Sequence, residues 1–129
     1  MVANQPEVAI TSEDQQMINK FARIHNNFVN LTDEIKLLLN DVQNFSEAAD
    51  EIMLLGDDDS VPLKMGTSFL HFTPEAAGER LESMKSEAEE KANQKKTEKE
   101  VMDAEMKRLK TTLYAKFGDR INLESEADD

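Results

Sequence analysis

GDDDSVPLKMGTSFLHFT, residues 56–73, interrupts two long stretches of helical repeat. Its first five residues are turn formers, and after them apolar and polar side chains alternate on both sides of Gly66, a pattern typical of strand, turn and strand. We expect a β-hairpin with Met65 and Gly66 at its turn, because Gly66 tolerates the positive φ that a type II turn or a glycine-bulged loop requires. The chain therefore reverses its direction here.

The hairpin carries more apolar side chains than it can bury alone. A two-stranded hairpin is marginal in water, and no other stretch of the sequence has the pattern of a third strand. We infer that hairpins from several chains join into one sheet or barrel, with Pro62, which lacks an N–H, restricting pairing along one side. The alternative is that the hairpin packs on the helices of its own chain. The side chains assigned to assembly are Val61, Leu63, Met65, Phe69, Leu70 and Phe72.

Residues 12–55 are expected to form the first helix. Thr11 or Ser12 can cap its start, with Asp14 or Gln15 in the capping-box position. Its apolar residues recur at alternating steps of four and three, which is typical of a coiled coil. These residues are Met17, Phe21, Ile24, Phe28, Leu31, Ile35, Leu38, Val42, Phe45, Ala49 and Ile52.

Residues 74–117 are expected to form the second helix. Thr73 caps it, Pro74 takes the first helical position where its missing N–H is harmless, and Gly118 ends it. Two runs of equal length joined by a reversal predict an antiparallel two-helix coiled coil. The predicted pairing sets Ile52 near Ala77, Leu38 near Lys91 and Met17 near Thr112.

The sequence thus predicts one mainly α domain over residues 1–129. We expect residues 1–11 to be a flexible lead-in, residues 56–73 an acidic connector with the hairpin, and residues 118–129 an acidic tail.

The apolar seam of the second helix is interrupted in its middle. Lys95 and Lys99 fall on the line that would face Leu31, Ile35 and Leu38. In one interpretation the lysine stems lie along the apolar stripe with their ammonium groups in water. In the other, the segment between Ala88 and Lys99 is loose and opens.

The composition excludes several classes of partner and compartment. The net charge of −12 repels nucleic-acid phosphates and anionic membranes, so we expect neither as a partner. Cysteine is absent, which excludes disulfides and thiolate chemistry. The first ten residues lack the positive region and apolar run of a secretory signal, so the chain is expected in the cytoplasm.

No constellation of residues indicates catalysis. His25 and His71 are far apart in the expected fold and are assigned solvent-facing or packing roles. A calcium loop begun at Asp57 would place Pro62 where the turn glycine belongs. Phosphate-binding loops and hydrolase motifs are missing from the sequence. We expect no enzyme activity, no cofactor and no metal.

Methionine and aromatic residues gather near both ends of the helical pair. Such side chains form an adaptable apolar surface, because the thioether chain repacks at little cost. A coiled-coil core is the alternative role for Phe21 and Leu113, whereas Tyr114 and Phe117 fall off the seam and are better placed for partner contact.

The two ends of the sequence resemble β-type subunits of the prefoldin family. The start from Thr11 to Ala22 is similar to the opening of such subunits, and Leu113-Tyr114-Ala115-Lys116-Phe117-Gly118 with Ile121 to Glu124 is similar to their close. Pro62, Gly66 and Phe69 fit the hairpin. Thr67 stands where the family usually has an acidic residue, and Ser12 where it usually has an aromatic one.

The resemblance implies a chaperone subunit. Such a chain joins α-type and other β-type subunits in a heterohexamer whose hairpins form a β-barrel platform. The complex binds unfolded actin and tubulin at its coiled-coil tips and delivers them to the cytosolic chaperonin without ATP. Residues carried over to client contact are Met17, Phe21, Leu113, Tyr114 and Phe117. A coiled-coil scaffold or adaptor that binds one folded partner remains the alternative.

Overall fold

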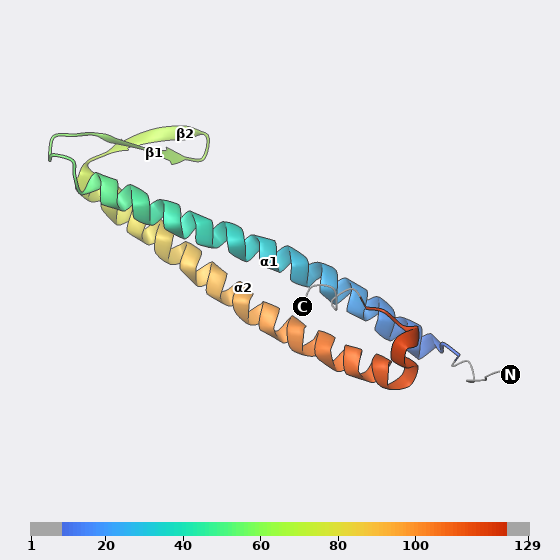
Figure 1. The fold of residues 1–129 in the computed structure, drawn as a ribbon. Coiled ribbons are helices and arrows are strands. Elements are labelled where there is room, and N and C mark those ends of the chain that lie inside the picture. Colours follow the sequence, from blue (N-terminus) through green and yellow to red (C-terminus); the bar gives the residue numbers. More distant parts are fainter. Residues whose placement is uncertain (1–8, 124–129) are drawn as a thin grey trace. The chain divides into compact units, whose positions relative to one another are not determined.

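The computed structural model describes residues 9–123 of the chain. Helix α1 (Ser12–Ile52) is followed by strands β1 (Val61–Met65) and β2 (Ser68–Phe72), helix α2 (Pro74–Phe117) and the short 3-10 helix η1 (Gly118–Arg120), as Figure 1 shows along its colour ramp. The predicted mainly α fold with a central hairpin is confirmed. Residues 1–8, expected to be flexible, lie outside the described residues. So do residues 124–129 of the expected acidic tail.

The start of α1 is a capping box, as the sequence predicts. The backbone N–H of Asp14 donates to the Thr11 hydroxyl over 3.1 Å, and the backbone N–H of Thr11 donates to the Asp14 carboxylate over 3.0 Å. Two N–H groups that lack helical partners are thereby satisfied. Of the alternatives that the sequence leaves open, Thr11 with Asp14 is the pair that forms.

The end of α1 lies three residues before the predicted one. The N–H groups of Leu54 and Leu55 donate to the carbonyls three residues back, over 3.1 and 3.0 Å, so the last turn tightens instead of continuing as α-helix. The N–H of Gly56 donates to the Asp59 carboxylate over 2.8 Å. Because that carboxylate offers an acceptor outside the helix, α1 ends at Ile52 and not at Leu55.

The hairpin turn is shifted by one residue from its predicted place. Met65 pairs with Ser68, so the two-residue loop is Gly66-Thr67 and not Met65-Gly66. Gly66 has a φ of 65°, and no residue other than glycine has a positive φ within the described chain. Glycine in the first loop position fits a type II′ turn, whose twist suits a two-residue hairpin better than the expected type II.

The described residues form two compact units. Unit 1 holds residues 9–32 and 97–123, and unit 2 holds residues 33–96. Segments of α1 and α2 pair in each unit: Lys20 contacts Glu105 over 2.7 Å in unit 1, and Lys95 contacts Glu34 over 2.8 Å in unit 2. Unit 1 also pairs Asp14 with Lys116, and unit 2 also brings Ile52 to Ala77. Within each unit the residue number rises on one helix as it falls on the other, so both pairings are antiparallel as predicted.

Lys95 and Lys99, in the middle of α2, are half-buried, and their ammonium groups have partners. Lys95 is half-buried and donates to the Glu34 carboxylate over 2.8 Å. In unit 1, the Lys99 ammonium lies 4.9 Å from the centre of the Phe28 ring, a cation–π contact. The half-buried side chains fit the first interpretation, but the ammonium groups contact a carboxylate and an aromatic ring, which that interpretation did not include. Opening of this segment stays a prediction.

The core of unit 2 joins the hairpin to the adjoining helix ends. Its buried side chains are Ile52, Val61, Ala77 and Leu81, with Phe45, Ala48, Ala49, Leu63, Phe72 and Met84 packed against them. Ile52 and Ala77 meet in one cluster, as the antiparallel register predicts. One face of the hairpin therefore packs on helices of its own chain.

Candidate functional site

The apolar core of unit 1 contains the side chains that the sequence assigns to client contact; we call it the terminal cluster. It forms where the start of α1 meets the end of α2. Its buried members are Phe21, Met106, Leu113, Phe117 and Leu123. Its half-buried members are Met17, Ile18, Ile24, Phe28, Leu109, Tyr114 and Ile121.

The structure brings all five predicted client-contact residues into the terminal cluster. Met17 and Tyr114 are half-buried, whereas Phe21, Leu113 and Phe117 have exposed fractions of 2%, 0% and 7%. Phe21 and Leu113 therefore take the core role that the sequence allows for them. Phe117, expected off the seam, is buried in the same core; its contact with a client stays a prediction. Contact of a client with the three buried side chains requires the cluster to open.

The segment that buries Phe117 is the part of the structure that sequence reasoning missed. Residues 118–123 were expected within an acidic tail, but Gly118 has a φ of 57° and redirects the chain into η1. Ile121 and Leu123 then pack on the terminal cluster, where Leu123 is 5% exposed. The signal in the sequence is the pair of apolar residues at alternate positions after a helix-ending glycine.

His25 has a packing role at the terminal cluster. Its ring is buried and stacks on Phe21, with centroids 6.3 Å apart and planes 11° from parallel. In unit 2, His71 lies within hydrogen-bond distance of Ser60, with Nδ1 and Oγ 3.1 Å apart. Within the described chain, no group of three or more histidine, cysteine, aspartate or glutamate side chains is arranged to bind a metal ion.

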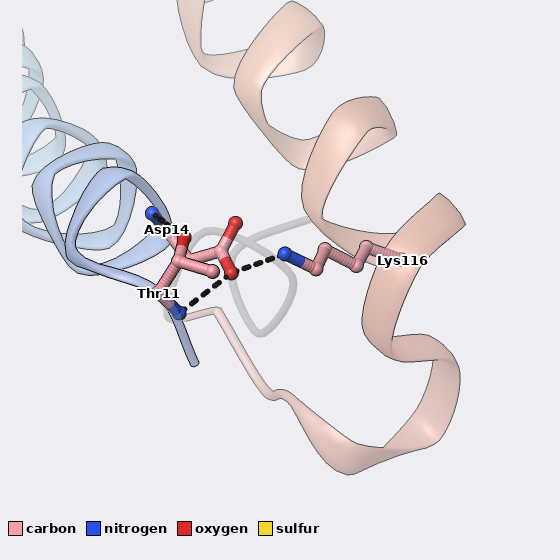
Figure 2. Close-up of polar contacts among 3 residues, drawn as sticks. All are labelled: Thr11, Asp14 and Lys116. Carbon is pink, nitrogen blue, oxygen red and sulfur yellow. Dashed lines mark hydrogen bonds and ion pairs between the residues drawn. The ribbon is translucent and has the colours of Figure 1, made fainter. Parts of the chain in front are cut away.

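An ion pair links α1 to α2 in unit 1, beside the terminal cluster. Figure 2 shows the Lys116 ammonium, from α2, donating to the same Asp14 oxygen that accepts the Thr11 N–H. The Lys116 to Asp14 distance is 2.5 Å, and the Asp14 residue is 3% exposed. The hydrogen bond from Lys116, followed by that from the Thr11 backbone, lowers the pKa of the Asp14 carboxyl below its ordinary value. Lys20 does the same to the pKa of Glu105.

These two lowered pKa values predict a loss of stability in acid. A carboxyl whose pKa is lower in the folded than in the unfolded chain stabilises the fold above the unfolded pKa, about 3.9 for aspartate. That stabilisation is lost as the pH falls through the folded pKa. We expect the urea concentration at the unfolding midpoint, measured by circular dichroism, to decrease as the pH is lowered below about 4.

Asp14→Asn separates the contribution of Asp14 from that of Glu105. The variant should be less stable than the parent chain at pH 7, because it loses the ion pair with Lys116. The difference should shrink as the pH falls from about 4, near the unfolded pKa, through the lower folded pKa at which the parent carboxylate becomes protonated. A difference that stays constant from pH 7 to pH 2 would contradict the assigned role.

A second group of apolar side chains lies exposed around the hairpin of unit 2; we call it the hairpin set. Phe69 and Leu70 are 63% and 51% exposed, and Met53 and Leu54 are each more than 80% exposed. The members are Met53, Leu54, Leu55, Phe69 and Leu70. Met53, Leu54 and Leu55 were not assigned to assembly from the sequence, although they directly follow Ile52, the last apolar position of the heptad repeat.

The six side chains that the sequence assigns to assembly divide between two environments. The two residues of a cross-strand pair lie on the same face of a hairpin. Leu70 therefore shares a face with Leu63, and Phe69 shares the opposite face with Lys64. Val61, Leu63 and Phe72 pack into the core of unit 2. Met65 is half-buried, and only Phe69 and Leu70 of the six are exposed. The role of these residues in assembly stays a prediction.

None of the described helices combines the length and apolar character that crossing a membrane requires.

Comparison with known proteins gives one family from the sequence and a matching fold from a solved structure. A family model described as "Prefoldin subunit" matches residues 15–120. The chain is 40% identical over 119 residues to the probable prefoldin subunit 4 of Caenorhabditis elegans, covering 91% of this chain and 94% of the relative. It is 38% identical over 121 residues to human prefoldin subunit 4, covering 93% and 90%.

A solved structure supports the architecture. The prefoldin β subunit from Thermococcus strain KS-1 superposes with a TM-score of 0.72 over 84% of this chain and 96% of that one. At 18% identity this likeness concerns the fold alone.

Proposed function

The chain belongs to the prefoldin family of chaperone subunits, which is non-enzymatic, and from this premise we propose that it binds non-native polypeptides at its terminal cluster without ATP. The clients we propose are unfolded actin and tubulin. The chain works in the cytoplasm as one β-type member of a heterohexamer of α-type and β-type subunits. The complex passes its clients to the cytosolic chaperonin.

The terminal cluster is the observation that carries this proposal. Its members are methionine, aromatic and aliphatic side chains from the N-terminal half of α1, the C-terminal part of α2 and the segment after η1. Burial of apolar surface is non-directional, so such a cluster can bind exposed apolar segments of many sequences. The thioether chains of Met17 and Met106 add adaptability, because they repack around ligands of different shape.

Assembly through the hairpin is the second part of the proposal. The hairpin pairs two strands only with each other among the described residues, which leaves both outer strand edges open. Exposed Phe69 and Leu70 add apolar area to those edges. Hairpins of neighbouring subunits that pair edge to edge would satisfy the backbone groups and bury these side chains in a shared barrel.

A light-scattering experiment tests chaperone activity. The complex of this chain with its partner subunits is added as unfolded actin is diluted from denaturant. We expect aggregation to be suppressed at near-equimolar complex, with the same result in the presence and absence of ATP. An equal mass of an acidic protein that is not a chaperone serves as the control.

A scaffold or adaptor is the second candidate, and the burial of Phe21, Leu113 and Phe117 favours it. A scaffold recognises one folded partner and needs no apolar surface open to varied sequences. It would leave actin aggregation unchanged in the same experiment, and that result would reject the chaperone proposal.

A further inference from the structure

Residues 121–123 lie on the terminal cluster as an extended segment. Gly118 turns the chain out of α2 with a φ of 57°, and after η1 the backbone of Ile121 is extended, with φ −123° and ψ 145°. Side chains of extended backbone point alternately to opposite sides. Accordingly Ile121 and Leu123 pack on the cluster, while Asn122 between them is exposed.

Two kinds of contact hold this segment. Leu123 is 5% exposed among apolar members of the cluster, and its backbone N–H donates to the Tyr114 hydroxyl over 3.1 Å. The first contact selects an apolar side chain of fitting size. The second contact is a hydrogen bond from the backbone, so any residue in extended conformation other than proline could donate it.

From these contacts we propose that the surface formed by Phe21, Leu113, Tyr114 and Phe117 is a receptor for extended polypeptide segments with apolar residues at alternate positions. The chain's own residues 121–123 are its internal ligand. The inference rests on the proposed function, because the segments that compete for the surface in a complete complex are those of non-native clients. In the free chain, residues 121–123 occupy this surface until a client displaces them.

A tethered ligand must lower the apparent affinity for an added one. Short flexible tethers give effective concentrations in the range of about 1 mM, so a tail that binds even weakly occupies its site most of the time. Removing the apolar anchor of the tail should therefore raise the affinity for an external segment without any new contact.

The probe is a fluorescent peptide with the sequence of residues 118–123, GDRINL. We expect it to bind the full chain carrying Leu123→Ser at least about tenfold more tightly than the parent chain. Asn122→Ser is the matched control: it changes the exposed residue of the same segment and should bind the peptide as the parent does. A peptide with serine at both apolar positions should not bind any of the three chains. Equal affinity of folded Leu123→Ser and parent chains, or no binding to either, would overturn the proposal.

A measurement on the parent chain covers the case in which Leu123→Ser fails to fold. The Leu123 N–H is protected by the Tyr114 hydroxyl, so a saturating peptide that displaces the tail should speed its hydrogen exchange. An unchanged exchange rate at saturation shows that the peptide binds elsewhere and refutes the inference. If the complex suppresses actin aggregation but the peptide does not displace residues 121–123, only the role of the tail is refuted. If the peptide displaces these residues but the complex does not suppress aggregation, only the proposed function is refuted.

Discussion

Leu113→Ala is expected to lower the free energy of unfolding of unit 1 by about 3 kcal/mol, within the range of 2 to 5 kcal/mol for buried leucines. Leu113 has no exposed surface and belongs to the same cluster as Phe21 and Phe117. Truncation removes the transfer free energy of its lost carbons and leaves a cavity whose walls relax only in part. Against a typical stability of about 5 to 15 kcal/mol, this is a large fraction.

Hydrogen exchange resolved by residue is the suitable measurement, because the loss should appear in the backbone amides of unit 1. Val101→Ala is the matched control, since Val101 lies on α2 in the same unit and is 61% exposed. It should change the stability by no more than about 0.5 kcal/mol. Similar effects of the two substitutions would show that the terminal cluster is not a packed core.

Replacing both Phe69 and Leu70 by aspartate is expected to remove the chain from the complex. Under the proposed assembly these side chains become buried between subunits, and an unpaired buried carboxylate costs several kcal/mol. Each 1.4 kcal/mol is about tenfold in an equilibrium constant, so recovery with tagged partner subunits should fall by at least about tenfold. The isolated chain should keep its fold, because both side chains are more than half exposed.

Leu37→Asp controls for the added charge. Leu37 is 66% exposed on α1 in unit 2, away from the hairpin in sequence, and its substitution should leave recovery unchanged. The single variants separate the two hairpin faces, because Phe69 and Leu70 lie on opposite ones. Recovery of the double variant at the parent level would contradict the assignment of the hairpin to assembly.

Local sequence patterns were sufficient to predict the two helices, the capping box and the glycines at which the chain turns. The heptad spacing predicts both helices because it depends only on residues a turn apart. The second helix begins at Pro74 and ends at Phe117, where Thr73 and Gly118 place its ends. The capping box at Thr11 and the positive φ of Gly66 and Gly118 are likewise local, since each depends on the conformational preference of one or two residues.

The turn of the hairpin and the end of α1 depend on particular contacts of the folded chain. The hairpin turn moved by one residue because the pairing of Met65 with Ser68 sets the register. The end of α1 moved because the Asp59 carboxylate accepts the Gly56 N–H. Neither contact is visible in a helical or alternating pattern of residues.

By itself the sequence determined the order and kind of the elements, the antiparallel register of the helices and which apolar residues gather at their ends. Only the tertiary structure decided which of those residues face solvent. Phe117 lies in a core that Ile121 and Leu123 join after the turn at Gly118. Leu70 is exposed although its cross-strand partner Leu63 packs in the core of unit 2. These environments depend on contacts between residues distant in sequence, and the spacing of residues along the chain carries no direct record of them.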